Sequence, residues 1–176
     1  KYSIDSETAV LLYVGRLAKE KSIEELLYCH KKTQGKGTVL MIAGDGPHRR
    51  ELEKQVSLLG IEASVIFTGM IPHEQIGEYY SAGDLFVSAS VSETQGMTYA
   101  EALASGLPLL CRKDDCLKGV IREGKNGWQY ESCREFLECL EKWMSLPRTE
   151  KEEMRRAAAD SAEPFSAERF ARKVEA

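Results

Sequence analysis

The sequence predicts an α/β fold in which helices cover both faces of a parallel β-sheet. Short apolar runs rich in β-branched residues alternate with longer segments of helical period along the 176 residues. Continuous apolar runs are typical of strands that are buried on both faces of a parallel sheet. With 43% hydrophobic and 30% charged residues, the chain has an ordinary globular composition, so we expect one well-buried domain.

Each expected strand is a short apolar run that ends at a turn signal. The first run ends at Gly15, and the second ends in the sequence Gly44-Asp45-Gly46-Pro47. The expected strands are residues 9–15, 38–43, 65–68, 85–88, 109–112 and 128–130.

Helices are expected where helical spacing follows a capping residue or a proline. Ser22 and Glu25 have the spacing of a capping box, and Pro47 suits the first turn of a helix. The expected helices are residues 22–35, 47–59, a segment after Pro72 that leads into Asp84, residues 96–104, about 116–122, about 134–145, about 149–159, and a last one after Pro164.

The charge balance and the cysteines exclude several classes of protein. With 24 Lys and Arg against 28 Asp and Glu, the net charge is −4, so no general positive field could hold a nucleic-acid backbone. The five cysteines lack zinc-type spacing, and we expect reduced thiols in a cytoplasmic protein. No apolar run reaches the roughly 20 residues of a membrane span. The start at Lys1 leads us to expect a fragment of a longer chain.

Functional residues are expected at the carboxyl ends of the strands, where open parallel sheets bind ligands. Arg16 follows the first strand and Lys21 stands five positions later, so the two cations could converge on one diphosphate. The alternative is that both are ordinary surface charges beside a helix start.

A second candidate group surrounds the expected helix start at Gly96. Backbone N–H groups and the helix dipole favour an anion there, and glycine permits close approach of a ligand. Glu93 precedes this start, and Glu101 stands eight residues after Glu93. Both carboxylates suit the hydroxyl groups of a ligand better than its phosphates. The alternative is a loop charge at Glu93 and an exposed or helix-capping carboxylate at Glu101.

The sequence Gly44-Asp45-Gly46 after the second strand is interpreted as a tight turn. A dinucleotide-binding fingerprint would need a further small residue where Arg49 stands, which counts against an NAD-dependent oxidoreductase. The three histidines have no metal-ligand spacing, and the chain has no nucleophile elbow and no P-loop lysine. No metal is expected.

Taken in order, these motifs resemble those of one large family, the retaining glycosyltransferases of family four, which have the GT-B fold and a Glu-x7-Glu motif. The resemblance implies that residues 1–176 are one Rossmann-like half of that fold, the C-terminal nucleotide-sugar-binding domain, without the N-terminal acceptor domain. The matching segments are Gly15-Arg16-Leu17 with Lys21, residues 43–47, residues 67–69, residues 93–101 and residues 104–108.

The resemblance also implies a role for each candidate residue. Arg16 and Lys21 would bind the donor diphosphate and stabilise it as it departs, which is their expected catalytic contribution. Glu93 would orient the donor sugar, and Glu101 would hold the ribose. Backbone groups at 96–98 would reach sugar and phosphate, and residues 70–71 would meet the base. The expected contacts of the nucleotide-sugar are Gly15, Arg16, Lys21, Gly44, Met70, Ile71, Glu93, Gly96, Met97, Thr98 and Glu101.

A narrower resemblance, carried by residues 92–96, 115–117 and 119–121, is to bacterial glucosyltransferases that act on diacylglycerol. It implies a UDP-glucose donor, no tightly bound cofactor, and a parent enzyme that contacts the inner face of a membrane through its own N-terminal domain. Asp114-Asp115 replaces the Gly-Gly of many family members, which leaves the donor sugar open. The fragment is expected to bind donor and transfer little. The alternative is a non-catalytic nucleotide-sugar-binding module.

Overall fold

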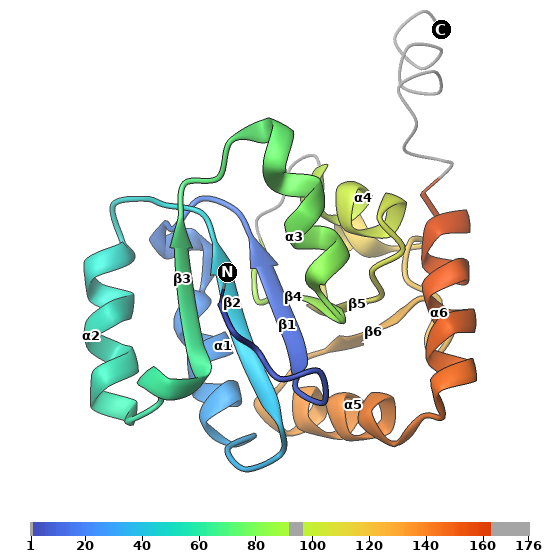
Figure 1. Ribbon diagram of the computed structural model, residues 1–176. Helices are drawn as coiled ribbons and strands as arrows, with labels where there is room; N and C mark the ends of the chain where they lie inside the picture. Colours follow the sequence, from blue (N-terminus) through green and yellow to red (C-terminus); the bar gives the residue numbers. More distant parts are fainter. Residues whose placement is uncertain (1, 92–96, 163–176) are drawn as a thin grey trace, which may run out of the picture.

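The computed structural model describes residues 2–91 and 97–162, and its six strands form one sheet (Figure 1). All neighbouring strands run parallel, which confirms the predicted α/β fold. The strands are β1 (Ala9–Val14), β2 (Thr38–Ala43), β3 (Val65–Gly69), β4 (Leu85–Ser88), β5 (Leu109–Arg112) and β6 (Gly127–Tyr130).

The order of the strands determines where a sheet of this kind is expected to bind a ligand. The order is β3-β2-β1-β4-β5-β6, so the chain builds one half outward from β1 and then returns to β4 beside β1. This is the Rossmann-like order, as predicted. In open parallel sheets, ligands bind where the direction of strand addition reverses, which in this order is at the carboxyl ends of β1 and β4.

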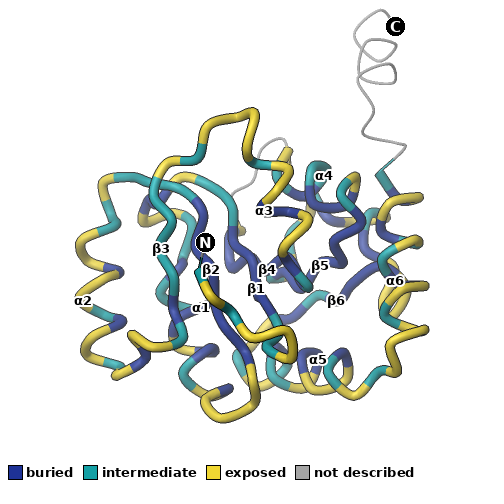
Figure 2. The backbone as a smooth tube through the Cα atoms, in the orientation of Figure 1, coloured by how far each residue is buried: buried dark blue, intermediate teal, exposed yellow. Residues whose placement is uncertain are grey.

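Two apolar clusters cover the two faces of the sheet. Along β1, Leu11 and Tyr13 belong to one cluster and Val10 and Leu12 to the other, which is the two-residue period of a strand. Figure 2 shows the strands mostly buried and the outer turns of the helices exposed. The first face carries α1 (Ile23–Lys31), α2 (Arg49–Leu59) and α5 (Cys133–Ser145), the second carries α3 (Ile76–Ala82) and α4 (Met97–Ala104), and α6 (Arg148–Asp160) contributes to both clusters.

The predicted capping box at the first helix is wrong. Ser22 precedes α1 but has φ 50° and ψ 38°, and its side chain caps no backbone group. The Ser22 N–H instead donates a hydrogen bond to the Lys19 carbonyl at 3.2 Å. This bond closes the preceding 3₁₀ turn, Lys19–Lys21. A capping hydroxyl needs an extended backbone instead. The helix also ends at Lys31, earlier than predicted, because the Thr33 hydroxyl donates to the His30 carbonyl at 2.8 Å and turns follow.

The helix predicted at about residues 116–122 is also wrong. The structure has only a 3₁₀ turn, Asp115–Leu117, in which the Asp114 carboxylate accepts from the Cys116 N–H at 3.0 Å. Gly119 follows with φ 76°, a conformation that ends helical geometry. The helix predicted after Pro164 lies outside the described residues.

Candidate functional site

A pocket of about 340 Å³ lies at the carboxyl ends of β1, β2 and β3, beside the start of α3. It brings together five of the residues that the sequence predicted as ligand contacts. These are Gly15, Arg16, Gly44, Met70 and Ile71, and the other lining residues are Val14, Ala43, Asp45 and Ile76. The wall is therefore apolar on the side of β3 and α3 and carries a cation at the end of β1.

The glycines of this pocket allow the loops after β1 and β2 to touch through their backbones. A Cβ atom at Gly44 would lie 1.9 Å from the Gly15 carbonyl oxygen, and Gly44 has φ 146°. The Gly15 N–H donates to the Ala43 carbonyl at 3.0 Å, and the Gly44 N–H donates to the Gly69 carbonyl at 3.1 Å. Close packing of the loops thus explains the glycine at position 44, whatever ligand the pocket binds.

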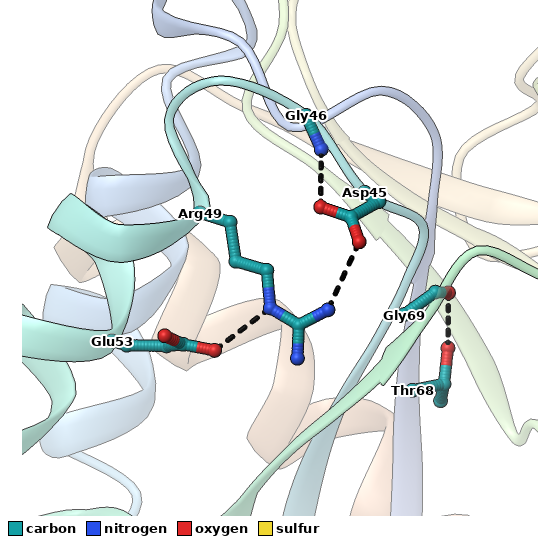
Figure 3. A network of polar contacts seen from close by, with 6 residues as sticks. All are labelled: Asp45, Gly46, Arg49, Glu53, Thr68 and Gly69. Carbon is teal, nitrogen blue, oxygen red and sulfur yellow. Dashed lines mark hydrogen bonds and ion pairs between the residues drawn. The ribbon is translucent and has the colours of Figure 1, made fainter.

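The turn after β2 is fixed by an ion-pair network (Figure 3). The Asp45 carboxylate accepts from the Gly46 N–H at 2.7 Å and from Arg49 Nη1 at 3.1 Å, and Arg49 Nε donates to Glu53 at 2.7 Å. These partners raise the pKa of Arg49, whose guanidinium also lies 5.9 Å from the Phe67 ring centroid. Arg49 therefore stabilises the turn through its ion pairs. It occupies the position where a dinucleotide fingerprint would have a small residue.

Arg16 is held at the pocket by its backbone. The Tyr13 hydroxyl donates to the Arg16 carbonyl at 3.2 Å, and the next residue, Leu17, is fully buried. The Leu17 N–H donates to the Asp45 carbonyl, and the Leu17 carbonyl accepts from the His48 N–H, both at 3.0 Å. The guanidinium of Arg16 is exposed and makes no hydrogen bond or ion pair within the described residues. A fixed backbone with an exposed cation suits the binding of an anion from solvent.

Four further predicted residues that the structure describes lie at the same edge of the sheet but outside the pocket lining. Lys21 is half-buried in the 3₁₀ turn before α1. Met97 and Thr98 form the first turn of α4, and Met97 is 61% exposed. Glu101, also on α4, is half-buried and accepts a hydrogen bond from the Tyr80 hydroxyl at 2.8 Å.

Two of the predicted contacts, Glu93 and Gly96, lie outside the described residues. Their predicted roles, and the predicted arrangement of Glu93 with Glu101, therefore stay predictions.

No functional role was predicted for two residues that belong to this region. Ile76 lines the pocket, and Tyr80 meets Glu101 from the same side of α3, one helical turn further on. Tyr79 and Tyr80 are both buried in the structure. No local sequence pattern predicts the contact between Tyr80 and Glu101, because the two residues are 21 positions apart and lie on different helices.

Within residues 2–91 and 97–162, no three His, Cys, Asp or Glu side chains gather in a way that could hold a metal ion. Over the same residues, none of the helices has the length and apolar character needed to traverse a lipid bilayer.

Comparison with known sequences places this site in a family context. Residues 1–162 match the family described as "Glycosyl transferases group 1". The chain is 41% identical over 133 residues to an alpha-monoglucosyldiacylglycerol synthase of Streptococcus pneumoniae, a match that covers 74% of this chain and 30% of that protein. A protein of the same name from Acholeplasma laidlawii is 34% identical over 142 residues, covering 80% of this chain and 36% of that protein.

Solved structures agree with the sequence comparison. Anabaena HepE in complex with UDP and glucose has a TM-score of 0.78 at 19% identity, covering 97% of this chain and 49% of that chain. This similarity confirms the predicted fold, which is one half of the GT-B fold. The chain spans about a third of the length of the two curated relatives, at 30% and 36%. Because the family match extends over nearly the whole chain, the protein belongs to the group 1 glycosyltransferases.

Proposed function

We propose that the chain is the donor-binding, C-terminal domain of a retaining glycosyltransferase that uses UDP-glucose. The observation that carries this proposal is the pocket itself, in which a fixed backbone presents the exposed Arg16 beside an apolar wall. A nucleoside diphosphate has both kinds of surface, a flat base and a charged diphosphate. Anabaena HepE, which has the same fold, was solved with UDP and glucose.

In this proposal the base, the ribose and the diphosphate of the donor each contact side chains or backbone groups of matching polarity. The base would lie against Met70 and Ile71, and the ribose hydroxyls would donate to the Glu101 carboxylate. The diphosphate would face Arg16 and Lys21 together with the first N–H groups of α4, whose helix dipole favours negative charge.

The catalytic contribution of the domain is electrostatic. As the bond between the sugar and the diphosphate breaks, negative charge grows on the leaving phosphate, and preorganised cations stabilise it. Arg16 and Lys21 would supply this stabilisation, and Glu93 would orient the sugar. A hexose would then move to the acceptor with its anomeric configuration retained.

The acceptor is proposed from the relatives. Two proteins named alpha-monoglucosyldiacylglycerol synthase are 41% and 34% identical to this chain, which supports diacylglycerol as the acceptor. Since the chain spans about a third of their length, we place the acceptor site and the contact with a membrane surface in an N-terminal domain of the parent protein. The isolated chain should bind donor without transferring sugar at an appreciable rate.

Isothermal titration calorimetry of the 176-residue chain with UDP and with UDP-glucose tests the proposal. The double variant Arg16→Ala/Lys21→Ala should weaken UDP binding about 100-fold, because each charged contact contributes about 1.5 kcal/mol or more. Arg156→Ala is the matched control, because it removes an exposed cation of α6 outside the pocket lining. No binding of UDP at millimolar concentration, or equal binding by wild type and double variant, would contradict the proposal.

A further inference from the structure

We propose that Tyr80 is a positioning residue that holds the Glu101 carboxylate in place to receive the ribose hydroxyls of the donor. This inference rests on the proposed function and deepens it. It assigns a role to a buried tyrosine that does not itself line the pocket.

The ring of Tyr80 is held rigidly enough to define where its hydroxyl lies. Tyr80 is only 2% exposed and packs in the cluster on the second face of the sheet. Its ring centroid lies 6.4 Å from that of Phe86, which in turn packs edge-on against Tyr99 at 5.8 Å. Phe86 belongs to β4 and Tyr99 to α4, so the ring is located by the sheet and by the helix that carries Glu101.

The contact between the two side chains has a fixed direction. The Tyr80 hydroxyl donates to Glu101 Oε2 at 2.8 Å. Burial, together with the hydrogen bond to Glu101, raises the pKa of Tyr80 far above its usual value, so the phenol stays protonated and remains the donor. A carboxylate can accept about four hydrogen bonds. Glu101 therefore keeps lone pairs on both oxygens, and Oε1 makes no hydrogen bond to another described residue.

The position of Tyr80 on α3 relates this carboxylate to the pocket. Ile76 lines the pocket and stands four residues before Tyr80, which places the two on one face of the helix. One helix thus forms part of the pocket wall and also orients the carboxylate next to it. A half-buried glutamate without such a partner would sample several rotamers, and fixing one of them on binding would cost affinity.

The test compares a ligand that has the ribose hydroxyls with one that lacks them. UDP and 2′,3′-dideoxy-UDP are titrated calorimetrically into the wild-type chain and into Tyr80→Phe, which keeps the buried ring. Tyr80→Phe should weaken UDP binding by up to about tenfold, because an unanchored Glu101 side chain must then be immobilised when UDP binds, and it should leave dideoxy-UDP binding unchanged.

Tyr79→Phe is the matched control. It removes a hydroxyl from the neighbouring position of the same helix, where the partner is Tyr2 at 3.3 Å and not Glu101. This variant should bind both nucleotides as the wild type does. Thermal melts of all variants report whether each one folds.

The double-mutant cycle with Glu101→Ala supplies a second readout. If Tyr80 acts through Glu101, Tyr80→Phe should have no further effect once the carboxylate is gone. An equal loss for UDP and dideoxy-UDP, no loss for UDP, or additive effects in the cycle would each overturn the inference while leaving UDP binding intact. Failure of the wild-type chain to bind UDP would instead overturn the proposed function.

Discussion

At the scale of single residues, His30 shows how burial changes the chemistry of a titratable group. The imidazole is 1% exposed, and its Nε2 lies 2.9 Å from the Ser64 carbonyl oxygen. Nδ1 lies 3.2 Å from the Thr33 hydroxyl. Burial is the main cause that lowers the pKa of His30 from 6.5 to about 4. The neutral ring therefore joins α1 to the segment before β3 and has no part in the proposed site.

The lowered pKa predicts a loss of stability in mild acid. Below pH 6.5 the unfolded chain binds a proton at His30, whereas the folded chain stays unprotonated until about pH 4. The free energy of unfolding should consequently fall by about 2 kcal/mol from this residue between pH 7 and pH 5. Urea denaturation at the two pH values measures it.

Two variants separate this effect from the titration of other groups. His30→Gln removes the titrating group, so the free energy of unfolding of this variant should depend less on pH than that of the wild type. His73→Gln, which changes an exposed histidine in the segment before α3, should behave like the wild type. If His30→Gln and the wild type lost the same free energy between pH 7 and pH 5, the explanation would be wrong.

At the scale of elements, the loops after β1, β2 and β3 are joined into one unit by their backbones. Gly44 sits at the centre, since its N–H bonds the carbonyl of Gly69 after β3 and its Cα faces the carbonyl of Gly15 after β1. The short Asp45 and Arg49 network then connects this unit to α2. The pocket is built on this unit, so its shape depends on positions that carry no functional side chain.

Replacing Gly44 by alanine should disrupt both stability and binding. The added Cβ would stand 1.9 Å from the Gly15 carbonyl oxygen, so the two loops must separate. We expect a loss of roughly 3 kcal/mol in the free energy of unfolding, together with weaker UDP binding. Denaturant titration and calorimetry measure the two effects.

Gly35→Ala is the matched control for Gly44→Ala. Gly35 also has a positive φ, 82°, but a Cβ there would meet nothing within 4 Å. The free energy of unfolding of this variant should fall by only about 1 kcal/mol, from backbone strain alone, and the variant should bind UDP as the wild type does. Similar losses in the two variants would show that the contact between the loops is not what requires glycine at position 44.

At the scale of the whole molecule, the proposed ligand contacts come from both halves of the sheet. The pocket lining belongs to the half that runs from β1 to β3 and to the start of α3, whereas Thr98 and Glu101 follow β4 in the other half. A ligand that contacted the pocket lining and also Thr98 and Glu101 would connect the two halves of the sheet. Ligand binding should therefore stabilise the fold as a unit.

UDP should raise the melting temperature of the chain. At 100 times its dissociation constant, a ligand that binds only the folded state adds about 3 kcal/mol. For a chain of this size the melting temperature should rise by roughly 5–10 °C. Scanning calorimetry with and without UDP measures the shift. At the same UDP concentration Arg16→Ala/Lys21→Ala should show almost none, and an equal shift in that variant would argue against Arg16 and Lys21 as diphosphate ligands.

Much of the site was predictable because parallel strands share an edge. The first apolar run ends at the carboxyl edge, so Gly15 and Arg16 could be placed there in advance. The family resemblance added Gly44, Met70 and Ile71, and the pocket lining includes all five residues. The composition and the periodicity determined the α/β class, because strands buried on two faces need continuous apolar runs. The ordered motifs determined the family.

The tertiary structure decided what depends on contacts between distant segments. The capping box at Ser22 failed because the preceding turn sets a left-handed backbone there, and the spacing of Ser22 and Glu25 carries no information about that turn. The contact of Tyr80 with Glu101 arises because α3 and α4 pack on the same face of the sheet. Periodicity records which face of an element is buried, whereas only the folded chain determines which buried faces meet.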